Sequence, residues 1–138
     1  MKRTAKAHWE GTLKEGKGTL TTQSGILNNT NYGFTARFEE GITGTNPEEL
    51  VAAAHAACFT MEVSSMITAK GFIPKKLDTE SIITMEGLSI KSAHLIISGG
   101  AEGMDAEEFE TMTSMATKNC IISKALNIKI TSEAKFIR

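Results

Sequence analysis

The sequence has few cysteines and prolines, and no excess of charge of either sign. Two cysteines in 138 residues are too few for the disulfide framework of a small secreted protein. Two prolines argue against a proline-rich linker or tail. Fifteen basic residues against sixteen acidic ones give a net charge of −1, so no basic surplus exists for a general electrostatic grip on nucleic acid or an anionic membrane. The two cysteines are therefore structural residues, metal ligands or working thiols.

The N-terminal sequence does not read as a targeting signal. Residues 1–6 are basic, but the chain continues through Trp9 instead of an apolar stretch. The most apolar segment, residues 50–61, contains His55 and is too short to cross a bilayer. We therefore expect a cytoplasmic protein whose thiols are kept reduced. The length suits one domain covering residues 1–138.

Hydrophobic periodicity predicts elements in the order β-β-β-α-β-β-α-β. The predicted strands are residues 5–9, 19–22, 34–39, 77–86, 89–98 and 128–136. The predicted helices are residue 46 to about 70, and residue 105 to about 120. Loops are expected at residues 27–33, Gly99, Gly100 and Gly103. This order predicts an α+β fold with largely antiparallel pairing.

Both helices have recognisable start signals. Asn46 can cap the free N–H groups of the first helix, and Glu49 can complete a capping box. Gly71 is the expected C-terminal stop of this helix. Asp105 and Glu108 form a second capping box at the start of the other helix.

The first helix is unusually apolar. Between residues 50 and 61 the only ionisable side chains are those of His55 and Cys58, and apolar or small residues cover every face. A helix that is apolar all round is expected to be buried all round. About 24 residues make a helix of roughly 36 Å, which is hard to bury inside so small a monomer. A dimer that shares its core would solve this problem.

Cys58 needs a nearby cation to act on a peroxide. The thiolate is the nucleophile, and burial in an apolar helix disfavours this charged form. Arginine keeps its charge when desolvated, and a carboxylate can hold it in place. The sequence offers Arg37 for this role, with Glu48 and Glu49 at the helix start. A second thiol such as Cys120 could then capture the sulfenic acid as a disulfide.

Spacing alone leaves other interpretations open. A cysteine in an alanine-rich helix is usually a small core residue, and Cys120 near a helix end is more often inert than resolving. Arg37 and Glu48 could be a surface ion-pair residue and a helix N-terminal charge. A metal site has little support, because no CxxC pair exists and the histidines are scattered at His8, His55 and His94.

The run from Asn46 to Phe59, NPEELVAAAHAACF, resembles the signature of the OsmC/Ohr family (osmotically inducible protein C and organic hydroperoxide resistance protein). Residues 7–11, 16–19 and 120–126 are similar to its OsmC branch. The resemblance spans nearly the whole chain. One departure is Ile121, because the family commonly has proline directly after its second cysteine.

The resemblance implies an OsmC-like α+β fold in which two chains intertwine as a homodimer. Antiparallel sheets surround two long central helices in this dimer. The resemblance also implies a thiol-dependent peroxidase that reduces organic hydroperoxides, protects against oxidative stress and is regenerated by a dithiol such as a lipoyl group. Carried over by motif, Cys58 is the peroxidatic cysteine, Cys120 the resolving cysteine, Glu48 the family carboxylate and Arg37 the OsmC-branch arginine. No metal, flavin or other cofactor is expected, and neither nucleic acid nor membrane is an expected partner.

Glu48 and Cys58 are ten residues apart in the predicted helix, which is about 15 Å along its axis. A glutamate side chain cannot span that distance. We therefore hypothesise that the Arg37–Glu48 pair serves the Cys58 of the partner subunit, or that Arg37 bridges the interface.

Two rival functions are weighed against the peroxidase. One is a non-enzymatic dimer that senses redox state or binds a ligand, with the disulfide as a switch. The other is thiol hydrolase or acyl-transfer chemistry at Cys58, which needs a general base. His55 lies only three positions away on a rigid helix and cannot readily turn toward Cys58, so it is interpreted as a satisfied core histidine.

Overall fold

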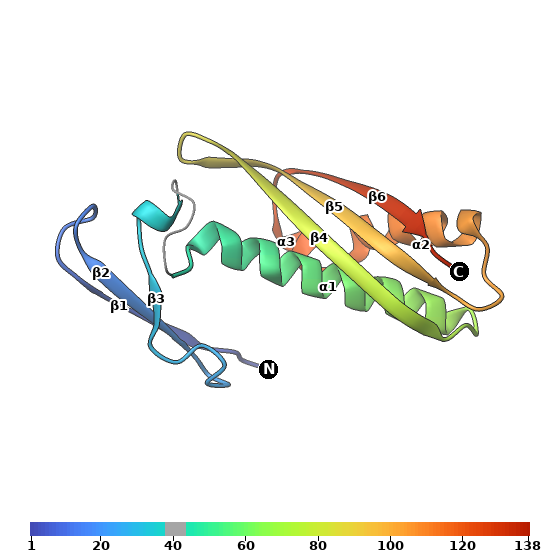
Figure 1. Cartoon of the computed structure of the whole chain (residues 1–138), viewed down its shortest axis with the longest axis horizontal. Helices are drawn as coiled ribbons and strands as arrows, with labels where there is room; N and C mark the ends of the chain where they lie inside the picture. Colours follow the sequence, from blue (N-terminus) through green and yellow to red (C-terminus); the bar gives the residue numbers. More distant parts are fainter. Residues whose placement is uncertain (38–43) are drawn as a thin grey trace. The chain divides into compact units, whose positions relative to one another are not determined.

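The computed structural model describes residues 1–37 and 44–138 (Figure 1). The chain divides into two compact units, Met1–Leu50 and Val51–Arg138, which are described in turn. Strands and helices follow one another in a mixed α+β arrangement, as the sequence predicts.

The first unit contains a three-stranded antiparallel sheet. Its strands are β1 (Ala5–Glu10), β2 (Lys17–Thr22) and β3 (Thr30–Tyr32), in that spatial order. The register places Gly18 between Trp9 and Tyr32, whose ring centroids are 5.5 Å apart. A Cβ atom on Gly18 would lie 2.5 Å from an atom of each ring. Glycine at this position therefore allows the two rings to meet across β2.

The third strand lies earlier in the sequence than predicted. β3 falls inside residues 27–33, which were expected to form a loop, and Thr35–Arg37 form the 3-10 turn η1 instead of a strand. Thr30 and Tyr32 are residue types that favour strands, and the packing of Tyr32 on Trp9 stabilises the pairing with β2. The end of the predicted strand, residues 38–39, lies outside the described residues.

Helix α1 (Pro47–Ala69) ends at the predicted glycine. Gly71 has a φ of +90°, and the N–H groups of Gly71 and Phe72 donate to carbonyls of the last helical turn at 2.9 and 3.2 Å. These two hydrogen bonds make a Schellman cap, which glycine favours because it adopts positive φ without a steric penalty.

Only one row of α1 is buried within the chain. The buried residues recur every four positions, at His55, Phe59, Val63 and Ile67. Ala53, Ala57 and Met61 on another face are exposed. The expectation of burial on every face is therefore wrong for the single chain.

By length and composition α1 is also apolar enough to cross a membrane. One such helix is weak evidence for a membrane span, because core helices of soluble proteins pass the same test.

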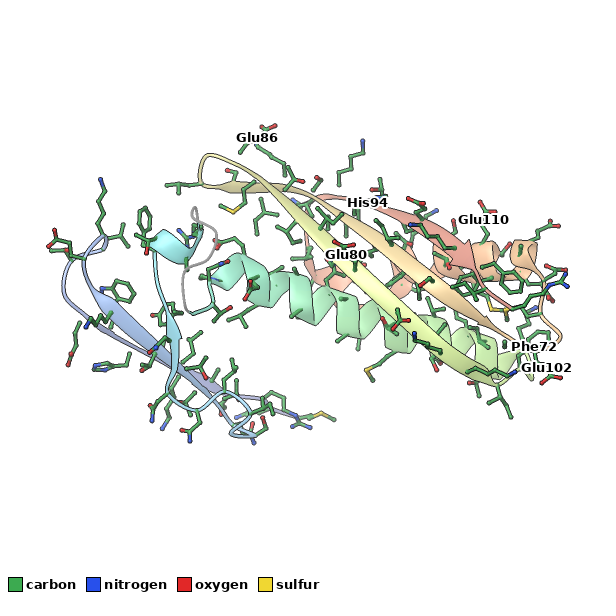
Figure 2. All side chains as sticks on the ribbon, viewed as in Figure 1. Phe72, Glu80, Glu86, His94, Glu102 and Glu110 are labelled. Atoms are coloured by element: carbon green, nitrogen blue, oxygen red, sulfur yellow. The ribbon has the colours of Figure 1, made fainter. Side chains whose placement is uncertain are left out.

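The second unit has a sheet of order β4-β5-β6. Its strands are β4 (Pro74–Glu86), β5 (Ser89–Ala101) and β6 (Lys129–Phe136). β4 and β5 form a long antiparallel hairpin, and Figure 2 shows Glu86 at its turn and Glu102 near its other end.

The chain crosses from β5 to β6 through two helices. These are α2 (Ala106–Asn119) and α3 (Ile121–Ala125). The crossover returns the chain to the end of the sheet where β5 began, so β6 pairs with β5 in parallel. The pairing is largely antiparallel, as predicted, because β1–β2, β2–β3 and β4–β5 are antiparallel and β5–β6 is the parallel exception.

Gly99 and Gly100 belong to β5 and not to the predicted loop. A Cβ atom on Gly99 would collide with the carbonyl oxygen of Lys76 on the paired strand. A Cβ atom on Gly100 would lie 2.7 Å from the ring of Phe136. These glycines therefore serve close packing within the sheet.

The core of the second unit lies between the inner face of the sheet and the helices. Inward-facing residues alternate along β5, where Ala93, Leu95 and Ile97 are fully buried. The predicted capping box of α2 is present between Asp105 and Glu108. Residues of α1, β5 and α2 join one hydrophobic cluster, whose members include Phe59, Val63, Ile67, Leu95, Ile97, Phe109, Met112, Ala116 and Cys120.

Candidate active site

Arg37 and Glu48 form an ion pair in the first unit. Arg37 Nε lies 3.0 Å from both carboxylate oxygens of Glu48. The two side chains are only 23% and 17% exposed, so solvent weakens their attraction less than it would on an open surface. The guanidinium carbon of Arg37 also lies 5.8 Å from the ring centroid of Phe34, within cation–π range.

The cap of α1 connects this ion pair to the start of the helix. Asn46 Oδ1 accepts the N–H of Glu49 at 2.9 Å, and Asn46 Nδ2 donates to the carbonyl of Ala36 at 2.9 Å. One side chain thus joins the turn that carries Arg37 to the helix that carries Glu48. The Glu49 carboxylate, predicted to complete a capping box, accepts instead the hydroxyl of Thr45 at 2.9 Å.

A small pocket of about 80 Å³ lies beside Arg37 within the first unit. Most of its wall is apolar or aromatic, contributed by Trp9, Leu13, Tyr32, Phe34 and Pro47. The guanidinium therefore has an apolar surface next to it, which suits a molecule with an apolar substituent attached to a polar reacting group.

Cys58 lies on α1 in the second unit and is half-buried. Its side chain packs against the core cluster that contains Cys120, which is fully buried. Both cysteines are free thiols. The fold thus brings the two cysteines, 62 positions apart in sequence, to the same core cluster.

Cys120 lies at the junction between α2 and α3. It is the C-cap of the first helix and the N-cap of the second, with φ −64° and ψ 145°. Its Sγ accepts the backbone N–H of Ser123 at 3.3 Å, and its thiol donates to Ser123 Oγ at 3.1 Å. The sulfur is therefore held by two contacts to a single residue.

Ile121 occupies the first position of α3 and is 71% exposed. Proline is favoured at the first helical position, and the extended backbone of Cys120 is the conformation that a following proline requires. The helix nevertheless forms with isoleucine here. The departure from the family pattern therefore leaves the cap at Cys120 in place.

His55 is buried against the segment that carries Cys120. Its Nε2 lies 2.8 Å from Ser123 Oγ, while its buried Nδ1 has no hydrogen-bond partner among the residues that the structure describes. Burial lowers the pKa of His55, because an apolar environment disfavours the charged ring. The histidine is in the core as predicted, but only one of its two ring nitrogens is paired.

Ser123 was not singled out from the sequence. The only sequence signal for it is its spacing of three residues from Cys120, a distance typical of side-chain caps. His8 and His94 lie elsewhere, beside Glu10 and Thr131 respectively. Within residues 1–37 and 44–138, no group of three or more His, Cys, Asp or Glu side chains is arranged to hold a metal ion.

Comparison with known proteins gives consistent matches. The family model described as OsmC-like protein matches residues 39–134. Peroxiredoxin OsmC of Escherichia coli (strain K12) and Peroxiredoxin OsmC of Shigella flexneri are each 44% identical to this chain over 129 residues, covering 91% of this chain and 90% of theirs. The crystal structure of the organic hydroperoxide resistance protein OhrB of Bacillus subtilis has the same fold, with a TM-score of 0.70 at 24% identity, covering 97% of this chain and 98% of that one. The chain therefore belongs to the OsmC-like protein family.

Proposed function

We propose that the protein is a thiol peroxidase that reduces organic hydroperoxides to alcohols, with Cys58 as the attacking thiol and Cys120 as the resolving thiol. The observation that carries this proposal is the packing of Cys58 against the core cluster that contains a second free thiol. The name of the relatives that are 44% identical supports a peroxide-related redox function. We expect the enzyme to act in the cytoplasm, where thiols are kept reduced.

The reaction consists of three exchanges at sulfur. The Cys58 thiolate attacks the distal oxygen of the hydroperoxide, the O–O bond breaks, and the alkoxide takes up a proton and leaves as the alcohol. The resulting Cys58 sulfenic acid is attacked by Cys120, which forms the disulfide and releases water. A dithiol, of the lipoyl type in our proposal, then reduces the disulfide by thiol exchange and is itself oxidised. One hydroperoxide and one dithiol are thus converted to one alcohol, one water and one oxidised dithiol.

Arg37 supplies the positive charge that this reaction requires, and Glu48 holds it in place. A guanidinium near the sulfur favours the thiolate and stabilises the charge that develops on the departing oxygen. Glu48 orients Arg37 through the contacts at 3.0 Å. The apolar wall beside Arg37 favours a hydroperoxide with an organic substituent.

We further propose that the working form is a homodimer. α1 exposes apolar and small residues such as Ala53, Ala57 and Met61, which a second subunit would cover. Glu48 and Cys58 are also about 15 Å apart along α1, too far for one side chain to span. In this dimer each active site combines Cys58 of one subunit with Arg37 and Glu48 of the other.

A heterodimer tests this sharing of sites. One chain carries Cys58→Ser and the other carries Glu48→Gln, with different affinity tags so that only the mixed dimer is purified. If sites are shared, one site of the mixed dimer is wild-type and the other carries both changes, so about half of the wild-type activity is expected. Each homodimer should be strongly impaired.

The matched control pairs a Cys58→Ser chain with a chain carrying both Cys58→Ser and Glu48→Gln, which contains no intact site in any arrangement. If sites are confined to one subunit, the first heterodimer also contains no intact site, and its activity should be no more than about half that of the Glu48→Gln homodimer. That result would contradict sharing.

Steady-state turnover tests the proposed function itself. With dihydrolipoamide as reductant, the wild-type protein should reduce cumene hydroperoxide with a kcat/KM at least about tenfold above that for hydrogen peroxide, because an apolar substituent in an apolar pocket contributes about 1–3 kcal/mol. The monothiol glutathione serves as a control reductant and should support slower turnover. Equal, slow rates with both peroxides would favour the redox-sensing or ligand-binding alternative.

A further inference from the structure

A buried polar chain connects Cys120 to a histidine that the reaction above does not use. The Cys120 thiol donates to Ser123 Oγ at 3.1 Å, and Ser123 Oγ lies 2.8 Å from His55 Nε2. Cys120 and His55 are 0% exposed, and Ser123 is 7% exposed. The chain therefore runs from one thiol to one imidazole through a single hydroxyl, shielded from bulk water.

We propose that Ser123 and His55 form a proton relay that removes the proton of Cys120 as this thiol attacks the oxidised sulfur of Cys58. The inference rests on the proposed function, because it gives a mechanism to the resolving step. Ser123 touches the reacting sulfur, and His55 acts through Ser123.

The geometry allows the proton to move without solvent. In the reduced protein the thiol donates to Ser123 Oγ and the Ser123 hydroxyl donates to His55 Nε2, which places the ring proton on Nδ1. As the S–S bond forms, the thiol proton moves to Ser123 Oγ and the hydroxyl proton moves to Nε2. The hydroxide released from the half-buried Cys58 sulfenic acid takes a proton from solvent and leaves as water, and the imidazolium later gives up its proton, which restores the neutral ring.

Two further features of His55 are compatible with a relay. Burial lowers the pKa of His55, so the ring is neutral at neutral pH and can accept a proton. Nδ1 of His55 has no hydrogen-bond partner among the described residues, so no contact at Nδ1 opposes the protonation of Nε2. During the transfer the N–H of Ser123, 3.3 Å from Sγ, remains in place to stabilise the thiolate.

The experiment measures the attack of Cys120 without any peroxide. The disulfide reagent 5,5′-dithiobis(2-nitrobenzoate) should react first with the half-buried Cys58 and release one thionitrobenzoate. Cys120 should then attack this mixed disulfide, form the protein disulfide and release a second thionitrobenzoate. Stopped-flow absorbance separates the two phases, and mass spectrometry identifies the product. The readout does not depend on peroxidase activity, so failure of the relay and failure of the proposed function are distinguished.

Three variants separate proton transfer from packing. Ser123→Ala removes the hydroxyl and should slow the second release by about 10²-fold. This is the lower end of the range for general-base catalysis, and we choose it because a thiol ionises more readily than an alcohol. Ser123→Thr restores a hydroxyl and should return the rate to near wild type. His55→Gln keeps a polar group facing Ser123 but cannot accept the proton, so it should be slow like Ser123→Ala. The first release should be unchanged in all three.

Thermal unfolding of each variant provides the folding control. The relay is refuted if Ser123→Ala or His55→Gln releases the second thionitrobenzoate at the wild-type rate. It is also refuted if folded Ser123→Thr is as slow as Ser123→Ala, since the hydroxyl would then not be the working group. A wild-type protein that releases only one equivalent would overturn the proposal as well, because Cys120 would then not attack Cys58 at all.

Discussion

Replacement of Cys58 by serine is expected to abolish the turnover of organic hydroperoxide, lowering kcat/KM by roughly 10³-fold or more. A serine hydroxyl is almost never ionised near neutral pH, and no second nucleophile replaces it in the proposed mechanism. Steady-state reduction of cumene hydroperoxide with dihydrolipoamide measures the loss. The variant should also produce no alcohol in a single exposure to peroxide.

Cys120→Ser is the matched control for this result. It leaves the attacking thiol in place, so one equivalent of alcohol per active site is expected in a rapid burst, followed by a stall or by over-oxidation of Cys58. Chemical quench with quantification of the alcohol distinguishes the two variants. Full turnover in Cys58→Ser would refute the assignment of the attacking thiol, and a Cys120→Ser protein without a burst would refute the separation of roles.

Local sequence signals were enough to place most elements of the fold. The start of α1 at Asn46, its end at Gly71 and the capping box of α2 all depend on contacts within a few residues, and the structure has them. Such contacts depend on side-chain chemistry at fixed offsets along the backbone, so they can be predicted without knowing the rest of the molecule.

Elements determined by distant partners were predicted less well. β3 is three residues long, and its position depends on the packing of Tyr32 against Trp9 across Gly18, which no local pattern reveals. Gly99 and Gly100 looked like loop residues because their role is to admit a neighbouring strand and an aromatic ring. In each case a long-range contact outweighed the local preference.

The candidate site shows the same division. Spacing placed Glu48 on the helix of Cys58, and side-chain chemistry offered Arg37 with either Glu48 or Glu49 as its carboxylate. The resemblance to a family selected Glu48, and the structure has Arg37 and Glu48 in contact at 3.0 Å. His55 and Ser123 are 68 positions apart, so neither periodicity nor a short motif could indicate their hydrogen bond. That contact required the packing of α1 on the segment after α2.

Removal of the charge at Arg37 is expected to lower kcat/KM by about 10²–10³-fold, the usual cost of losing one group that stabilises charge in a transition state. Arg37→Met keeps much of the side-chain length and loses the charge. Arg37→Lys keeps the charge but not the planar group that contacts both oxygens of Glu48, so partial activity is expected. Single-turnover oxidation of Cys58 by cumene hydroperoxide isolates the affected step from the later ones.

Two neighbouring glutamates provide the matched test of the carboxylate. Glu48→Gln removes the negative charge that orients Arg37, so we expect a large loss in the same single-turnover rate. Glu49→Gln keeps an oxygen that can accept the Thr45 hydroxyl and removes only a negative charge from the first turn of α1, so we expect a loss of about 0.3–1 kcal/mol in stability with little change in rate. In a double-mutant cycle, Glu48→Gln should have little further effect in the Arg37→Met background, because the group it orients is already absent. Equal rate losses in the two glutamine variants, or full additivity in the cycle, would mean that Glu48 acts on stability and not through Arg37.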